Sequence, residues 1–155
     1  MNGHQLIDRY RLIPHPEGGC YREVYRSGQT LLSPAAGKAR SALTHIYFLL
    51  AAGQVSRFHK VIHDEVWNFY EGDPLKLIQY DGVKVTEVII GVAGGDFVSV
   101  VKGGVFQAAE STGAFSLAGC TVAPGFEFED FSFLADDSEL KIKLTENCPV
   151  YRRLL

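Results

Sequence analysis

The sequence predicts an all-β domain, a sandwich or barrel of antiparallel strands. Between residues 41 and 122, apolar runs rich in β-branched and aromatic residues recur at intervals of roughly 8–12 residues. No amphipathic stretch of helix length interrupts this region, which argues against a parallel α/β sheet. The 16 glycines and the 12% aromatic content suit short strands joined by tight turns. The 155 residues are enough for one domain with a real core, which we assign to residues 1–155.

The N-terminal part should contain a helix, a corner and a strand. Apolar residues spaced three and four apart predict an amphipathic helix over residues 4–12, with Asn2 as its N-cap. The segment PHPEGG at residues 14–19 should end that helix and form a rigid corner, because the residue before a proline is disfavoured in helical conformation. Residues 20–27 alternate as a strand does. Residues 29–40 are small, polar and interrupted by proline and glycine, and we expect a mobile loop.

A series of strands should fill the chain as far as residue 122. Residues 41–53 predict a central buried strand, and residues 53–72 predict two strands folded back on each other. Asp81-Gly82 is the strongest hairpin signal in the chain. It should join strands at 74–80 and 83–90, followed by a glycine-rich turn at 91–96 and strands at 97–101, 105–110 and 114–122.

The C-terminal part changes in character after Phe126. The acidic and aromatic residues from 126 to 137 indicate a last strand or a covering loop. Residues 138–147 alternate partly as a strand does, but we predict a helix because Asp137 or Ser138 can cap it. Pro149 suits the first turn of a further short helical segment.

Charge and composition exclude several function classes. The formal net charge of −3 is too small to indicate binding to nucleic acid or to an anionic membrane surface. No apolar run approaches the length of a transmembrane helix, and the first residues are too polar for a signal peptide. The three cysteines have no CxxC spacing, which predicts reduced thiols and a cytoplasmic protein.

Residues 53–72 carry the most specific pattern. Gly53 is followed by five residues and then His59, and Glu65 is followed by six residues and then Gly72. This stretch resembles the first sequence motif of the cupins, G-x5-H-x-H-x3,4-E-x6-G, except that Val61 stands at the second histidine. The resemblance therefore bears more strongly on the fold than on metal chemistry.

Four further stretches extend the resemblance over most of the chain. They are PHPEGGCYREVYRS at 14–27, HIYFLL at 45–50, HDEVWNFYEGDPL at 63–75 and GCTVAPGFEFEDF at 119–131. Together they resemble a family of small single-domain cupins of unassigned function, some of them described as predicted sugar epimerases. The resemblance implies a double-stranded β-helix, or jelly roll, that is usually a dimer and has a pocket in the barrel mouth. It implies no established reaction.

The metal ligands of many cupins are only half present. His59 and Glu65 remain, whereas Val61 and Gln107 stand at the other two positions. A tight metal site needs three or four well-placed ligands, so we expect none, with a divalent metal at His59 and Glu65 as the alternative. His63 is a candidate replacement ligand, but we expect it exposed in a turn between strands.

Strand alternation predicts which side chains face the barrel interior. By parity and motif, His59, Glu65 and Trp67 should converge with Gln107 on one cavity. We expect both residues to be catalytic, with His59 as general base and Glu65 as its orienter or as the acid. Glu65 should share a hydrogen bond with His59, directly or through a water, and raise the pKa of the histidine. Trp67 would stack on a sugar ring. The alternative is a buried polar cluster that satisfies only itself.

Further residues complete the predicted site. Gln107, Tyr70 or Tyr47 can supply a hydrogen-bond donor to a carbonyl oxygen of the ligand. Glu17, in the PHPEGG corner with His15, either reaches the rim of the pocket or a partner subunit, or belongs to a corner with no functional role. Cys120 has no histidine beside it in the sequence, and we expect a buried, inert thiol.

The most probable function on this evidence is proton transfer on a small polar molecule, by a sugar or sugar-phosphate isomerase or epimerase. The second class is a non-catalytic cupin that uses the same pocket to bind a small polar ligand such as a carbohydrate. The third is a metal-dependent oxygenase. We also expect a homodimer, because the apolar strand face around Tyr21 and Tyr25 needs cover and the resemblance points the same way.

Overall fold

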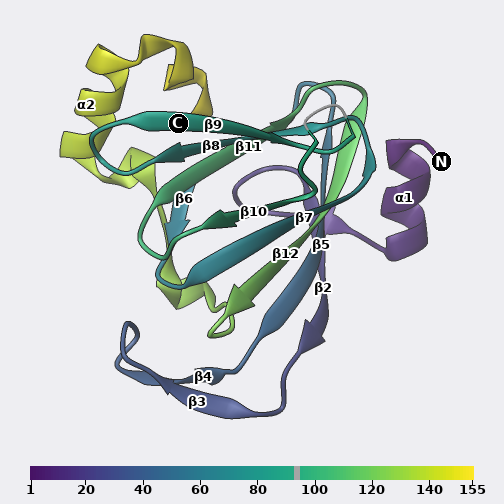
Figure 1. Cartoon of the computed structure of the whole chain (residues 1–155), viewed down its shortest axis with the longest axis horizontal. Helices are drawn as coiled ribbons and strands as arrows, with labels where there is room; N and C mark the ends of the chain where they lie inside the picture. Colours follow the sequence, from purple (N-terminus) through teal and green to yellow (C-terminus); the bar gives the residue numbers. More distant parts are fainter. Residues whose placement is uncertain (93–94) are drawn as a thin grey trace.

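The computed structural model describes residues 1–92 and 95–155, which form two antiparallel β-sheets packed face to face (Figure 1). The first sheet has the order β1 (Ile13–Pro14), β2 (Cys20–Arg26), β5 (Thr44–Ala51), β12 (Phe115–Ala123), β7 (Asp64–Gly72) and β10 (Val98–Val101). The second has the order β13 (Phe131–Phe133), β6 (Val55–Val61), β11 (Phe106–Ser111), β8 (Leu75–Tyr80) and β9 (Val85–Ile90). Neighbours in each sheet are mostly distant in sequence, as in a jelly roll. The predicted all-β fold is confirmed.

The two strands that carry the cupin-like motif lie in different sheets. β6 pairs with β11 and β13, whereas β7 pairs with β12 and β10. The expectation that they fold back on each other as a hairpin is therefore wrong. Both strands bury one face against the other sheet, so the chain crosses the sandwich between them. This crossing brings His59 on β6 and Glu65 on β7 to the same interior from opposite sides.

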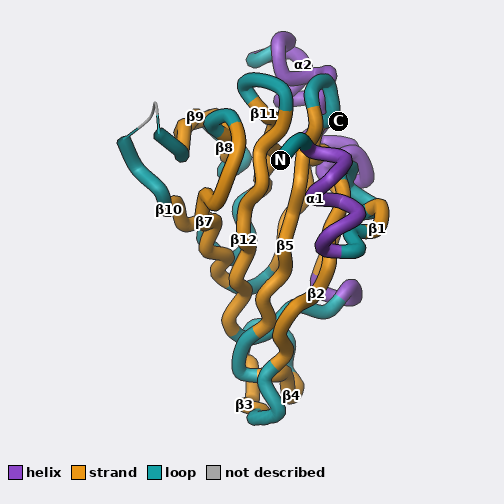
Figure 2. Tube along the Cα trace, turned by 90° about the vertical axis from the view of Figure 1, so that its right-hand side faces the viewer, coloured by secondary structure: helices purple, strands orange, loops and turns teal. Residues whose placement is uncertain are grey.

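The N-terminal helix α1 (Gly3–Tyr10) covers one end of the outer face of the first sheet (Figure 2). Its N-terminus has a capping box, in which the Asn2 side chain accepts from the Gln5 backbone and the Gln5 side chain accepts from the Asn2 backbone. Leu6 anchors it in an apolar cluster with Leu49 and Leu117 of the sheet.

The C-terminal segment covers the outer face of the second sheet. It contains the one-turn helices η1 (Phe128–Asp130) and η2 (Leu134–Asp136), the helix α2 (Ser138–Asn147), and η3 (Pro149–Leu154). Leu134, Leu144 and Leu154 pack against Phe58 and Ile78 of that sheet. Asp137 caps α2 by accepting from the backbone of Leu140, as the helical interpretation of this segment predicts.

Residues 29–40 form a hairpin, β3 (Thr30–Ser33) and β4 (Lys38–Ser41), where a mobile loop was expected. It extends from one end of the sandwich (Figure 1). Long-range contacts hold it, among them a two-point ion pair of Arg40 with Asp130 and a distance of 2.6 Å between Ser33 Oγ and His63 Nε2. Asp130 and His63 lie far from residues 29–40 in the sequence, so the composition of this stretch alone could not indicate that it is held in place.

The predicted strands at 74–80 and 83–90 pair as β8 and β9. The predicted glycine-rich turn at 91–96 falls partly on residues 93–94, which lie outside the described residues. Within the described part of the chain, no helix is long and apolar enough to cross a membrane.

Candidate functional site

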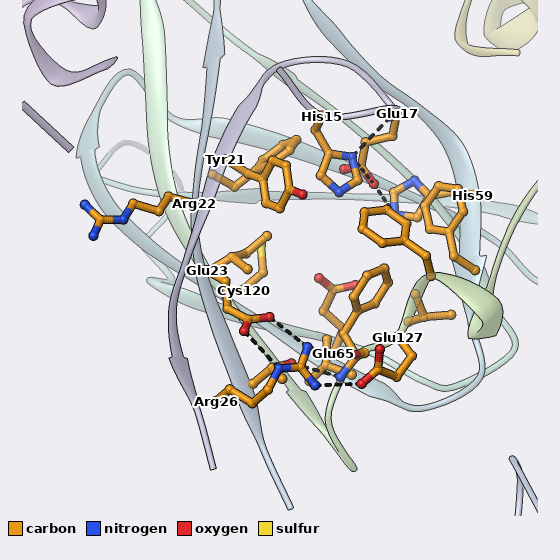
Figure 3. A pocket seen from close by; sticks show the side chains of 18 of the residues that line it. His15, Glu17, Tyr21, Arg22, Glu23, Arg26, His59, Glu65, Cys120 and Glu127 are labelled. Carbon is orange, nitrogen blue, oxygen red and sulfur yellow. Dashed lines mark hydrogen bonds and ion pairs between the residues drawn. The ribbon is translucent and has the colours of Figure 1, made fainter. Parts of the chain in front are cut away.

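The inner faces of the two sheets enclose a cavity of about 550 Å³ at one end of the sandwich (Figure 3). Its polar groups come from β2, β6, β7, β12 and the 14–19 corner, and its apolar walls are largely aromatic. A volume of this size is typical of a site for a small molecule. The apolar and aromatic wall residues include Ile46, Phe48, Val61, Val122, Phe126, Phe128 and Phe131.

The most concentrated chemistry in the cavity is a buried pair of acid and base. Glu17 Oε2 lies 3.1 Å from His59 Nε2, and both side chains are almost fully buried. His15 Nδ1 lies 3.5 Å from the same carboxylate oxygen. The other oxygen, Oε1, accepts a hydrogen bond of 2.7 Å from Ser56 Oγ. Glu17 was predicted only as one option for the pocket rim, and the structure places it deep in the cavity beside His59.

An irregularity in β6 brings the two partners of Glu17 together. The register against β11 shifts between Gln107 and Ala109, so that His59 and Ser56, three residues apart, both face inward. An extra residue in one strand of a pair has this effect, because it reverses the alternation beyond it. A regular strand would have turned one of the two away from Glu17.

The 14–19 corner is fastened to β6 by main-chain contacts. The Arg57 backbone N–H donates to the Glu17 carbonyl oxygen at 2.8 Å, and the Arg57 side chain donates to the Pro16 carbonyl oxygen at 2.8 Å. Gly18 adopts φ of 112° and lies so close to the Val55 carbonyl that a Cβ there would be 2.0 Å from its oxygen. These contacts fix where the 14–19 corner lies along β6 and therefore where the Glu17 side chain enters the cavity.

The tautomer of His59 follows from its neighbours. Nδ1 lies 2.7 Å from the Arg57 carbonyl oxygen, which can only accept, so Nδ1 carries a hydrogen. Nε2 therefore faces Glu17 Oε2 with either a lone pair or a second hydrogen. When either Oε2 carries a hydrogen or Nε2 carries a second one, one proton is shared between the carboxyl group and the imidazole.

Burial sets the protonation of this pair. Desolvation raises the pKa of Glu17 to about 8, although the Ser56 hydroxyl acts in the opposite direction. Burial also lowers the pKa of His59, against the opposing influence of the Glu65 charge. The expectation of a raised histidine pKa is therefore wrong, because loss of hydration outweighs the attraction of the carboxylate. The pKa of His15 falls to about 4, through burial and then the charge on His59.

Glu65 faces the cavity from β7, across from the Glu17–His59 pair (Figure 3). It accepts a short hydrogen bond from the Gln107 amide, whose oxygen in turn accepts from Trp67 Nε1 at 2.7 Å. Burial raises the pKa of Glu65 to about 7, and the charge on Glu17 adds to this effect. The partner of His59 is thus Glu17, and the predicted hydrogen-bond partner Glu65 is held by Gln107.

Trp67 and Gln107 do not line the cavity. Trp67 is 1% exposed and packs edge-on against Phe48 in the core, so its ring presents no face to a ligand. Gln107 is fully buried and uses its amide between Trp67 and Glu65. The structure assigns them to the layer behind the cavity wall, where they orient Glu65.

Tyr47 and Tyr70 lie on the other face of the first sheet. With Tyr10 and His45 they line a shallow hollow outside the sandwich, and Tyr70 Oη lies 3.0 Å from His45 Nε2. The physical reason is strand parity: Tyr70 is an odd number of residues from Glu65 and therefore points to the opposite face. Their expected position at the cavity is wrong.

Sequence reasoning missed the tyrosine that does reach the cavity. Tyr21 on β2 turns into it beside His15, with ring centroids 4.4 Å apart (Figure 3). The alternation of residues 20–27 placed Tyr21 and Glu23 on one face, and that signal was sufficient to include them. Cys120, expected to be buried and inert, is buried in the cavity wall, and burial raises the pKa of its thiol.

The residues present do not suit the four-ligand metal site of many cupins. Val61 offers no donor, and both ends of the Gln107 amide are engaged by Trp67 and Glu65. Among the described residues, no group of three or more His, Cys, Asp or Glu side chains has a geometry that could hold a metal ion. His63, expected in an exposed turn, is 5% exposed and bonded to Ser33, away from the cavity.

The comparisons with known proteins agree with this architecture. The family model described as "Cupin superfamily (DUF985)" matches residues 4–134. The chain belongs to this cupin family. An uncharacterised protein of Saccharomyces cerevisiae is 34% identical, over 88% of this chain and 77% of its own length.

Two solved structures of this cupin's relatives resemble it over nearly its whole length. A hypothetical protein from Leishmania major has a TM-score of 0.85 and 28% identity, covering 99% of this chain and 96% of that one. A protein from Shewanella oneidensis has a TM-score of 0.83 and 31% identity, covering 99% and 94%. None of the three descriptions states an activity, so the chemistry must be argued from the cavity itself.

Proposed function

We propose that this cupin is an isomerase that moves a proton on a small carbonyl compound of the carbohydrate class. The observation that carries the proposal is the buried Glu17–His59 pair, with 3.1 Å between Glu17 Oε2 and His59 Nε2. A pair of this kind can accept a proton from a carbon atom of the ligand and return it. General acid–base catalysis by such groups contributes roughly 10²–10⁴-fold to a rate.

The pKa of the acid supports this role. A catalytic base works best when its pKa is near the operating pH, and that of Glu17 is about 8. An ordinary glutamate, which ionises near pH 4.5, would be a weaker base toward a proton on carbon. Burial produces the difference, against the opposing effects of the Ser56 hydroxyl and the Arg57 charge.

The proposed step balances with groups that line the cavity. Glu17 Oε2 takes the proton from the carbon beside the carbonyl group, and the electron pair of that C–H bond forms an enediol or enolate. The developing negative charge on the carbonyl oxygen accepts a hydrogen bond from the Tyr21 hydroxyl. Glu17 then returns its proton to the former carbonyl carbon. The hydroxyl proton on the neighbouring carbon passes to the former carbonyl oxygen, which the Tyr21 hydroxyl contacts, and this transfer completes the isomerisation. Phe131, stacked on His59 with centroids 5.1 Å apart, and the other aromatic walls suit the apolar face of a sugar ring.

Solvent isotope exchange tests the proposal. Reducing sugars incubated with the protein in D₂O should gain deuterium at the carbon beside the carbonyl group. Proton NMR measures this exchange as the loss of the signal of that C–H group. Glu17→Gln keeps the shape of the side chain and removes its basicity, so exchange should fall about 100-fold or more. Exchange that is equal in wild type and Glu17→Gln would contradict the proposal.

A second candidate is a cupin that binds a small molecule without reaction. The specific observation in its favour is the apolar character of the walls, where Phe126, Phe128 and Phe131 stand on one side. A sugar that raises the thermal midpoint but shows no exchange in D₂O would favour this second function.

A further inference from the structure

We propose that the molecule bound in this cavity carries an amino group, held as a cation by Glu65 opposite the Glu17–His59 pair. The inference rests on the proposed function for the location of the site and adds the charge class of the substrate. The charged group that the cavity recognises is then an amine, whereas a sugar phosphate would present a phosphate.

Glu65 is a buried carboxyl group that forms no ion pair with a Lys or Arg side chain in the described part of the chain. It is 7% exposed and faces the cavity (Figure 3). Among the described residues, its hydrogen-bond donors are neutral: the Gln107 amide and the Cys120 thiol. A buried carboxylate is normally compensated by a Lys or Arg, so a cationic ligand is the missing partner.

The pair on the other side does not compensate Glu65. Because one proton is shared between Glu17 and His59, that pair has no net charge when His59 Nδ1 carries its own hydrogen. His15 accepts a hydrogen bond at Nδ1 from the Glu17 backbone and is neutral near pH 7. An ionised Glu65 therefore leaves one unmatched negative charge inside the cavity.

The arginines at the mouth do not offer a site for an anion. Arg26 lies between two carboxylates, donating to Glu23 at 2.9 Å and to Glu127 at 2.7 Å. Arg22 points away from the cavity and donates to the Tyr10 carbonyl oxygen (Figure 3). Arg11 lies exposed at the outer edge of the mouth. The group around Arg26 is net negative, which attracts cations and disfavours phosphates.

The aromatic walls of the cavity also favour an ammonium group over an anion. Phe48, Phe131 and Tyr21 present aromatic rings around the space in front of Glu65. A desolvated ammonium group gains from aromatic faces as well as from a carboxylate. A phosphate or carboxylate would meet the same rings and two carboxyl groups, with no deep cation to neutralise it.

Binding should follow a matched chemical series. Sugars with one skeleton and a hydroxyl, an amino or a phosphate group, such as glucose, glucosamine and glucose 6-phosphate, are compared by thermal shift at pH 7.5. The amino members should stabilise the protein, and the phosphates should not. Equal or greater stabilisation by neutral or phosphorylated members overturns the proposal, as does a panel in which no amino sugar binds.

Titration calorimetry then tests the role of Glu65. Below the pKa of the ligand's own ammonium group, binding of the amine should release protons, because it favours the ionised form of Glu65, and should tighten from pH 5.5 to pH 7. Glu65→Gln should weaken amine binding about tenfold or more and leave the neutral analogue unchanged. Glu139→Gln, the same chemical change at a side chain 83% exposed on α2, is the control. Unchanged amine affinity in Glu65→Gln contradicts the proposal, whether or not isotope exchange is observed.

Discussion

Two glutamates decide the chemistry of this cupin at the scale of single residues. Glu17 and Glu65 are both about nine-tenths buried or more, and neither forms an ion pair with Lys or Arg among the described residues. Burial therefore raises the pKa of both, to about 8 and about 7. A carboxyl group that keeps its proton at neutral pH is costly to ionise in the fold, and such groups cluster at functional sites.

These raised pKa values predict a loss of stability as the pH rises. The unfolded chain ionises both carboxyl groups near pH 4.5, whereas the folded chain keeps their protons until about pH 7 to 8. At these two groups the folded state therefore binds more protons, and their contribution to the free energy of unfolding should fall between pH 4.5 and 8. The lowered pKa values of His15 and His59 act in the opposite direction below pH 6.5. From the shift at Glu65, its contribution is on the order of 3 kcal/mol.

Chemical denaturation at pH 5 and pH 8 measures this effect. Glu65→Gln should reduce the loss of stability between these two pH values, because glutamine does not ionise. Glu139→Gln on α2 should leave the loss as it is in wild type. A wild-type protein that is more stable at pH 8 than at pH 5, by a margin that Glu65→Gln does not change, would show that Glu65 ionises normally.

At the scale of elements, the 14–19 corner and β6 act as one unit. The corner supplies Glu17, and β6 supplies Ser56 and His59 from either side of its register shift. Gly18 makes the contact possible, because its φ of 112° and its distance to the Val55 carbonyl exclude a side chain. The position of Glu17 depends on this close approach together with the hydrogen bonds from Arg57 to the corner.

Gly18→Ala should therefore disturb both stability and the site. Its Cβ would overlap the Val55 carbonyl oxygen at 2.0 Å, so the corner must move away from β6. Loss of about 2 kcal/mol or more is expected, together with loss of proton exchange. Gly53→Ala is the control: its φ of 76° is also positive, but nothing lies within 4 Å of its Cβ. Equal costs for the two substitutions would contradict the close-contact explanation.

The sequence predicted the elements better than their partners. Hydrophobic alternation and the motif spacing identified most strands and the inward direction of His59 and Glu65. They did not show that β6 and β7 belong to different sheets, because strand pairing is set by long-range packing. The β3–β4 hairpin was missed for the same reason, since Arg40 and Asp130 are 90 residues apart.

The errors at the site have equally specific causes. Tyr70 was placed at the cavity without its parity being counted, and it lies on the outer face. Trp67 has the correct parity, but the inner face of β7 is deep enough at that position to bury the ring completely. Glu17 could not be assigned with certainty, because a proline- and glycine-rich corner has no periodicity from which to infer its direction.

At the scale of the whole molecule, the first sheet ends in an open edge. β1 pairs with β2 only at Tyr21 and Cys20, so the remainder of β2 has no neighbouring strand on that side in the described part of the chain. Val24 and Tyr25 on this edge are 41% and 55% exposed. An open edge with apolar side chains favours pairing with a second copy, and a homodimer remains our prediction.

Light scattering at micromolar concentration tests the homodimer. The wild-type protein should have twice the mass of one chain, and Tyr25→Lys should shift it toward the monomer by placing a charge on the edge. Val83→Lys, at an 85% exposed position between β8 and β9, is the control and should leave the mass unchanged. A wild-type protein that scatters as a monomer would exclude the homodimer.

The central claim is that Glu17 and His59 share one proton inside the cavity, and carbon-13 NMR of the Glu17 carboxyl group tests it most directly. Titration of protein labelled at the glutamate side chains, with Glu17→Gln to assign the signal, should give an apparent pKa for Glu17 near 8. The same signal should shift in His59→Gln, because the partner of Oε2 is removed. A Glu17 carboxyl group that titrates near 4.5, and does so equally in wild type and His59→Gln, would contradict the shared proton and the proton-transfer function built on it.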